Sequence, residues 1–161
     1  MQRTPGTTPR LTIDGEPMAQ FLNLSGFAEE MLVHENACVA IDKEMPMDRA
    51  ALIGCSVVTG AGSVFNAARI KAGESIAIIG AGGIGLSAIN AAKIAGAGEI
   101  VAIDPVESKR TMAEKMGATM TFDAMDENVV SQVIEATGGG VDHAIECVGK
   151  AVTAQLAWKV L

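Results

Sequence analysis

Residues 75–85 read SIAIIGAGGIG, and this stretch decides the fold of the chain. The apolar run at 75–79 predicts a buried strand, and the helical spacing of apolar residues from Ile84 to Ala95 predicts a helix. Glycines 80, 82 and 85 therefore fall in the turn between a strand and a helix. This spacing is typical of a turn that holds the pyrophosphate of a dinucleotide.

Each of the three glycines has a separate physical role in such a turn. Gly80 permits the tight turn, Gly82 allows the backbone to approach a pyrophosphate, and Gly85 lets the helix pack closely on the strand. The amino terminus of the helix supplies free N–H groups and the positive end of its dipole. The sequence therefore predicts dinucleotide binding, against the alternative of a purely structural strand, turn and helix.

An acidic residue, Asp104, follows the second predicted strand, where a dinucleotide site has the residue that binds the adenosine ribose. The second apolar strand, 100–103, ends in Asp104, and 104 − 85 = 19 residues is the separation at which an acid meets the adenosine ribose. A carboxylate there would repel a 2′-phosphate, so Asp104 favours NAD over NADP. The alternative interpretation is an acid stabilised by the amino terminus of the next helix.

Strands and helices alternate strictly from residue 74 onward. The pattern predicts an α/β fold with a doubly wound parallel sheet of about four strands in the order 3-2-1-4, covered by helices on both faces. The expected strands are 75–79, 100–103, 120–122 and 141–148, and the expected helices are 84–95, 107–116 and 126–136. Before residue 74 we expect loop-like structure over 1–20, a hairpin-like pair within 27–41, and helices at 49–53 and 57–70.

Composition narrows the possible partners. The chain has 161 residues, with 12 Lys and Arg against 19 Asp and Glu, so its formal charge is −7. This acidity argues against nucleic acid or an anionic membrane surface as a partner. Three cysteines form neither a disulfide framework nor a zinc ribbon, which favours the reducing cytoplasm. Neither a secretory signal nor a membrane span is expected.

A second motif, GCSVVTG at residues 54–60, precedes the first strand of the alternating part. Taken alone, Cys55 is most often a small buried core residue. Gly60 and Gly62 fall inside the expected helix, where each glycine costs up to about 1 kcal/mol relative to alanine. Their presence suggests that a ligand or another backbone approaches this helix closely.

Five motifs in this order resemble the zinc-containing medium-chain alcohol dehydrogenases, from about residue 26 to residue 161. The residues that carry the resemblance are GCSVVTG at 54–60, KAGE at 71–74, GAGGIG at 80–85 with Asp104, GGVD at 139–142 and ECVG at 146–149. Residues 33–42 are similar to the glutathione- or mycothiol-linked and nicotinoprotein branch. The resemblance implies NAD and catalytic zinc as cofactors, and a small alcohol or aldehyde as substrate.

The resemblance also implies roles for individual residues. Cys55 matches a ligand of the catalytic zinc, and Thr59 matches a catalytic-site position beside the nicotinamide ring. Lys109 matches a residue that reaches the adenosine ribose. Besides Gly80, Gly82, Gly85 and Asp104, the implied cofactor-binding residues are Gly83, Ile84 and Val148. Zinc would polarise the alcohol oxygen, and hydride would pass to the nicotinamide.

The domain organisation implied by the resemblance has three parts. Residues 1–54 would end a β-rich GroES-like catalytic domain, 55–73 would form a connecting helix, and 74–161 would form a partial Rossmann NAD-binding domain. The family's other zinc ligands have no counterpart here, so the chain resembles a central fragment, and we expect it to be inactive alone. A homo-oligomer is expected for the full-length protein.

Two alternative functions remain open at this point. One is a non-catalytic dinucleotide-binding module of the redox-sensing type, and the other is a zinc-free quinone or enoyl reductase relative. The GCSVVTG motif favours the alcohol dehydrogenase lineage over both. We also expect strand 141–148 to be an unpaired edge with an uncovered apolar face at Ile145 and Cys147, prone to self-association.

Overall fold

A computed structural model describes residues 11–18 and 26–161 of the chain. The chain divides into two compact units, Met1–Glu44 and Met45–Leu161. In the first unit, β1 (Leu11–Ile13) and β2 (Glu16–Met18) pair antiparallel, and η2 (Glu35–Ala37) is a short 3₁₀ turn.

The hairpin expected within 27–41 is wrong, because η2 is the one regular element of that range. His34 favours the 3₁₀ turn, since its Nδ1 accepts a hydrogen bond of 3.1 Å from the Asn36 N–H. The hairpin lies at 11–18 instead, in the range expected to be loop-like. Asp14 and Gly15 form its turn with φ of 51° and 84°, the positive pair that a two-residue hairpin connection requires.

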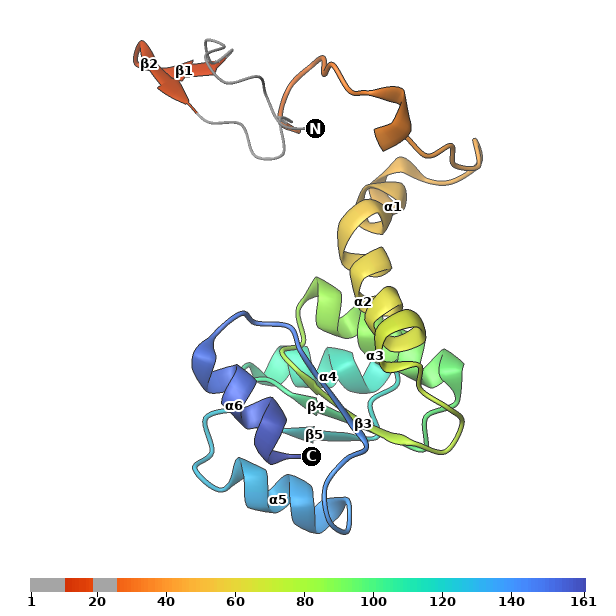
Figure 1. Ribbon diagram of the computed structural model, residues 1–161, viewed down its shortest axis with the longest axis vertical. Coiled ribbons are helices and arrows are strands. Elements are labelled where there is room, and N and C mark those ends of the chain that lie inside the picture. The colour runs from red at the N-terminus through yellow and green to blue at the C-terminus, as the bar shows by residue number, and fades with distance from the viewer. Residues whose placement is uncertain (1–10, 19–25) are drawn as a thin grey trace. The chain divides into compact units, whose positions relative to one another are not determined.

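The second unit contains a four-stranded parallel sheet (Figure 1). Its order is β5-β4-β3-β6, which confirms the expected 3-2-1-4 topology. Every neighbouring pair in the sheet is parallel. The strands are β3 (Ser75–Ile79), β4 (Glu99–Ile103), β5 (Met120–Phe122) and β6 (His143–Glu146), the last shorter than the expected 141–148.

Helices cover both faces of this sheet because successive side chains of each strand point to opposite sides. Ile76 and Ile78 belong to a core cluster with α3, whereas Ala77 and Ile79 belong to a cluster with α5 and α6. Figure 1 shows α5 and α6 together on one side of the strands. The helices are α3 (Gly83–Ala95), α4 (Glu107–Met116), α5 (Val129–Ala136) and α6 (Ala151–Lys159).

One helical run replaces the two helices expected before residue 70. It consists of α1 (Met47–Leu52), η3 (Ile53–Val57), α2 (Val58–Gly62) and η4 (Ser63–Ala68). The break expected at 54–56 is wrong, because a stretch of wider π-helical turns continues the helix through Gly54. Arg69 ends the run in the left-handed conformation, with φ of 55°.

The same run, Met47–Ala68, is long and apolar enough to cross a membrane by length and composition alone. This is weak evidence, because core helices of soluble proteins also meet the criterion. Its second half packs within the unit, since Val64 is fully buried in the cluster that contains α3.

Within residues 26–161, β6 pairs with β3 alone and is an edge strand, as expected. The expectation of an uncovered apolar face is wrong. Ile145 and Cys147 are partly buried against the cluster of Ile76, Ile78 and α3. Burial and the neighbouring Glu146 charge raise the pKa of the Cys147 thiol to about 11, so it behaves as a packed apolar side chain.

Candidate dinucleotide-binding site

The turn between β3 and α3 has the geometry that its glycines predict. Gly80 has φ of 97°, which a residue with a Cβ rarely adopts. A Cβ on Gly85 would collide with the Gly80 carbonyl, whose carbon would lie 2.9 Å away. Gly80 therefore allows the chain to turn, and Gly85 allows α3 to start directly against the end of β3.

Gly82 differs from both because it faces open space. Nothing lies within 4 Å of the position that its Cβ would take, and the residue is exposed. Gly82 is the residue before the first turn of α3, where the leading N–H groups of a helix have no intrahelical acceptor. The turn thus offers free backbone and a positive dipole end to an anion such as a pyrophosphate.

The turn lies at the point where the order of the sheet reverses. The chain leaves β3 toward β4 on one side, whereas β6 lies on the other side, and ligands of doubly wound sheets bind at such switch points. Val148 follows β6 and comes close to the turn, since its Cγ2 would lie 2.6 Å from a Cβ on Gly80. The structure therefore brings Val148 beside the glycines.

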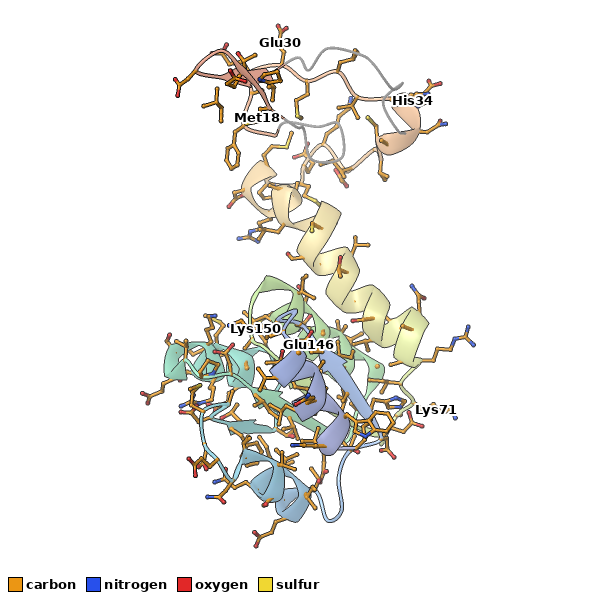
Figure 2. The ribbon with its side chains drawn as sticks, turned by 60° about the vertical axis from the view of Figure 1, so that its left-hand side comes forward. Met18, Glu30, His34, Lys71, Glu146 and Lys150 are labelled. Carbon is orange, nitrogen blue, oxygen red and sulfur yellow. The ribbon has the colours of Figure 1, made fainter. Side chains whose placement is uncertain are left out.

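Glu146 organises the loop that carries Val148. Its carboxylate accepts hydrogen bonds from the Val148 N–H at 2.7 Å, the Gly149 N–H at 3.0 Å and the Thr153 hydroxyl at 2.8 Å. Partial burial alone would raise the pKa of Glu146, but these hydrogen bonds outweigh it and leave the pKa below its ordinary value. Figure 2 shows Glu146 beside the beginning of α6, close to Lys150.

Asp104 lies on the other side of the turn, at the end of β4. Its Oδ2 accepts a hydrogen bond of 2.8 Å from the Ala81 N–H, and its Oδ1 accepts one of 2.9 Å from the Val106 N–H. The Nζ of Lys109 lies 3.9 Å from Oδ2 and is half-exposed. The contact with Val106, which precedes α4, matches the alternative interpretation of Asp104 as an acid at a helix amino terminus. The contact with Ala81 was not predicted.

The GCSVVTG segment lies beside the first turn of α3. A Cβ on Gly83 would lie 3.2 Å from the Ser56 Cβ. A Cβ on Gly60 would collide with the Ile84 carbonyl and lie 2.7 Å from the Ser87 Cβ. The close approach that Gly60 predicted is therefore made by the backbone of α3. Thr59, the residue before this crossing, is exposed.

The described residues do not form a metal site by themselves. Ranges 11–18 and 26–161 contain no group of three or more His, Cys, Asp or Glu side chains that could hold a metal ion. Cys55 is a free, exposed thiol, which rules out the buried core residue that its type suggests. One thiolate cannot supply the three protein ligands of a catalytic zinc, so this set of residues does not fit the metal.

Polar contacts at the opposite end of the strands hold β3 and β6 in register. Asp142 Oδ2 accepts 2.8 Å hydrogen bonds from both the N–H and the hydroxyl of Ser75, and the Ser75 N–H in particular lowers the pKa of Asp142. His143 Nε2 lies 3.0 Å from Glu74 Oε2. The Lys71 N–H chiefly, and then His143, lower the pKa of Glu74. The GGVD motif thus has a structural role away from the glycine turn.

Comparison with known proteins identifies this arrangement. A family model described as zinc-binding dehydrogenase matches residues 83–161, from the first turn of α3 through α6. This match spans 79 of the 161 residues. The match begins within the GAGGIG motif and includes Asp104, Lys109 and Val148.

This chain also resembles individual dehydrogenases over most of its length. It is 38% identical over 144 residues to alcohol dehydrogenase 2 of Hordeum vulgare, and 38% identical over 147 residues to the S-(hydroxymethyl)glutathione dehydrogenase of a Synechocystis strain. These alignments cover 88% and 90% of this chain but only 39% and 40% of the relatives. The chain thus spans about two fifths of their length.

Solved structures give the same result. An alcohol dehydrogenase zinc-binding domain protein from Burkholderia ambifaria has a TM-score of 0.83 and 39% identity, covering 92% of this chain and 40% of that one. Benzyl alcohol dehydrogenase from Acinetobacter calcoaceticus has a TM-score of 0.73 and 36% identity, covering 76% of this chain and 34% of that one. The Rossmann-like fold is therefore shown, and both similar structures are named as alcohol dehydrogenase proteins.

Proposed function

We propose that the chain binds NAD(H) at the turn of residues 80–85 and supplies this site to a zinc-dependent oxidoreductase of the alcohol dehydrogenase type. The observation that carries the proposal is the open space at Gly82 beside the start of α3. It lies between two glycines at which a Cβ does not fit. Similarity to alcohol and S-(hydroxymethyl)glutathione dehydrogenases supports the same conclusion.

Each part of the cofactor has candidate residues. The N–H groups around Gly82, Gly83 and Ile84 would hold the pyrophosphate, and Asp104 with Lys109 would bind the adenosine ribose. Val148 and Thr59 would border the nicotinamide. When bound, NAD supplies the hydride acceptor, and these residues bind and orient it.

Zinc is proposed only for the whole protein, with Cys55 as one ligand among others that the described residues do not contain. Hydride transfer between an alcohol and an aldehyde, a homo-oligomeric state and a cytoplasmic location are likewise proposals for that protein. Three free cysteines are consistent with a reducing compartment.

Titration of the full chain with NADH and NADPH, followed by cofactor fluorescence, tests the proposal. NADH should bind more tightly, because Asp104 would repel a 2′-phosphate and accept the ribose hydroxyls. Equal affinities or tighter NADPH binding would contradict the role of Asp104. Binding of neither cofactor would contradict the proposed site.

A further inference from the structure

Asp104 makes a contact that ribose binding does not require. The residue is only 3% exposed, and a carboxylate so buried is costly unless its oxygens accept hydrogen bonds. Its two oxygens accept from N–H groups on different segments, Ala81 in the glycine turn and Val106 before α4. One side chain thus joins the turn to the adjacent loop.

Ala81 is the central residue of the first Gly-x-Gly, and its N–H donates to the Asp104 carboxylate. It is 2% exposed, between Gly80 and the open backbone at Gly82. The preceding N–H, that of Gly80, donates to the Ile103 carbonyl at 2.8 Å. Two consecutive N–H groups of the turn are therefore held by the end of β4, one by its backbone and one by Asp104.

Asp104 is itself held in place through its backbone. Its N–H donates to the Phe122 carbonyl at 3.2 Å, and its own carbonyl accepts a 2.7 Å hydrogen bond from Arg110. Arg110 also pairs with Asp123 at 3.5 Å, beyond the end of β5. The carboxylate therefore projects from a fixed strand end, as a group that positions another segment must.

We propose that Asp104 is a positioning residue for the phosphate-binding turn in addition to its expected role at the ribose. The inference rests on the proposed binding of NAD(H), and it assigns the residue a task that is independent of the ribose hydroxyls. Replacing Asp104 would then weaken the turn that every dinucleotide needs. Such a replacement would reduce affinity for NAD and NADP together rather than exchange one cofactor for the other.

The informative variant is Asp104→Ser in the full chain. A serine hydroxyl can still accept from the N–H two residues later, at Val106, but it is too short to replace the contact with Ala81. Asp104→Asn is a second variant of nearly the same shape. It cannot serve both N–H groups, because one oxygen becomes an NH₂ donor. Glu107→Gln is the matched control, since Glu107 is an exposed acid three residues away.

Two ligands separate the two roles of Asp104. ADP carries both the ribose hydroxyls and the pyrophosphate, whereas 2′,3′-dideoxy-ADP keeps the adenine and the pyrophosphate and lacks both hydroxyls. Calorimetry gives the Kd of each. If Asp104 positions the turn, both variants bind dideoxy-ADP about tenfold more weakly or worse, as expected for loss of a hydrogen bond to a charged group. Loss of the negative charge alone would strengthen phosphate binding, which is the opposite result.

Hydrogen exchange at the Ala81 amide, measured by NMR without any ligand, is the second readout. Positioning predicts faster exchange at Ala81 in both variants, with Ile78 in β3 and the Glu107→Gln protein unchanged. Unchanged Ala81 exchange together with unchanged affinity for dideoxy-ADP would overturn the inference. A wild-type chain that binds neither ligand would refute the proposed function, while exchange at Ala81 would still decide whether Asp104 holds the turn.

Discussion

At the scale of single residues, the glycine turn separates the requirements of folding from those of binding. Gly85 has no room for a Cβ because of the Gly80 carbonyl, whereas the same position at Gly82 is empty. Gly85→Ala is therefore expected to destabilise the protein by about 1–3 kcal/mol or more, as overpacking does. Gly82→Ala should leave the midpoint of urea unfolding close to that of the wild type.

Gly82→Ala, which we expect to fold like the wild type, should instead be impaired in cofactor binding. The methyl group of Gly82→Ala would occupy the space through which a pyrophosphate approaches, so we expect its affinity for NADH to fall by at least tenfold. Fluorescence titration measures this loss. Undiminished NADH binding by Gly82→Ala would show that the phosphates lie elsewhere.

The Ser75–Asp142 contact gives a pH-dependent prediction. The pKa of Asp142 lies below its ordinary value of 3.8 in the folded protein, chiefly because the Ser75 N–H donates to it. A lowered folded pKa contributes stability that is present above the unfolded pKa and is lost as pH falls through the folded one. Asp142→Asn should therefore be less stable than the wild type at neutral pH, and the difference should shrink below pH 3.8.

Urea unfolding at a series of pH values measures this difference. Glu127→Gln is the control for removal of one negative charge, because Glu127 is exposed near the beginning of α5. A stability difference between wild type and Asp142→Asn that stays constant across the acid range would refute the pKa argument.

At the scale of elements, the crossing of α2 and α3 depends on one glycine. Gly60 is buried, and a Cβ there would collide with the Ile84 carbonyl and approach the Ala88 nitrogen to 2.8 Å. Gly60→Ala should cost about 1–3 kcal/mol of stability and also weaken NADH binding, because it displaces the first turn of α3. Chemical denaturation and NADH titration measure the two effects.

Gly62 supplies the matched control on the same helix. The nearest atom to a Cβ at this position is the Asn66 Nδ2 at 3.8 Å, which is ordinary contact. Gly62→Ala should therefore gain up to about 1 kcal/mol from helix propensity and leave NADH binding unchanged. Equal effects of the two substitutions would show that the crossing does not depend on Gly60.

How much of the fold the sequence predicts depends on the length and periodicity of each element. From residue 74 onward, long apolar strands and amphipathic helices predicted all four strands and the sheet order. Boundaries shifted by a few residues, as at β6. The strands β1 and β2 lie outside this alternation, which revealed the equally short β5, and they were missed although Asp14-Gly15 is a recognisable hairpin turn. Before residue 74, π-helical turns join the two predicted helices into one run through the exposed Gly54.

The backbone geometry of the candidate site was predictable, whereas its role in binding stays a prediction. Gly80, Gly82 and Gly85 have the conformation and space that their spacing indicates. The contacts of Asp104 with Ala81 and of Glu146 with Val148 join segments whose separation follows only from the assembled sheet. The periodicity of the sequence does not indicate which N–H group donates a hydrogen bond to a given carboxylate.

At the scale of the whole molecule, we expect the 161-residue chain to bind NADH without oxidising alcohols. Cys55 is an exposed thiol, and residues 11–18 and 26–161 contain no group of three or more His, Cys, Asp or Glu side chains that could hold a metal ion. A metal with one protein ligand is held too weakly to polarise an alcohol. Incubation with zinc, NAD and a series of alcohols should give no NADH absorbance above background.

A chain that turns over alcohols in this assay would contradict the assignment of the metal site. The NADH titration described above is the internal control, since a chain that binds cofactor is folded. Added zinc should also leave the thermal unfolding midpoint unchanged, because no closed set of ligands couples the metal to folding.

The central position of β3 in the sheet has a consequence for synthesis on the ribosome. β4 lies 24 residues beyond β3 in register, whereas the Ser75–Asp142 contact that brings in β6 spans 67 residues. Synthesis proceeds at roughly 5–20 residues per second, so the edge of β3 that pairs with β6 stays unpaired for about 3–13 s. Protease digestion of ribosome-stalled chains should find protection of Ile76–Ile79 only after β6 has emerged. Until then, the buried strand β3 has an open edge that can pair with a neighbouring chain.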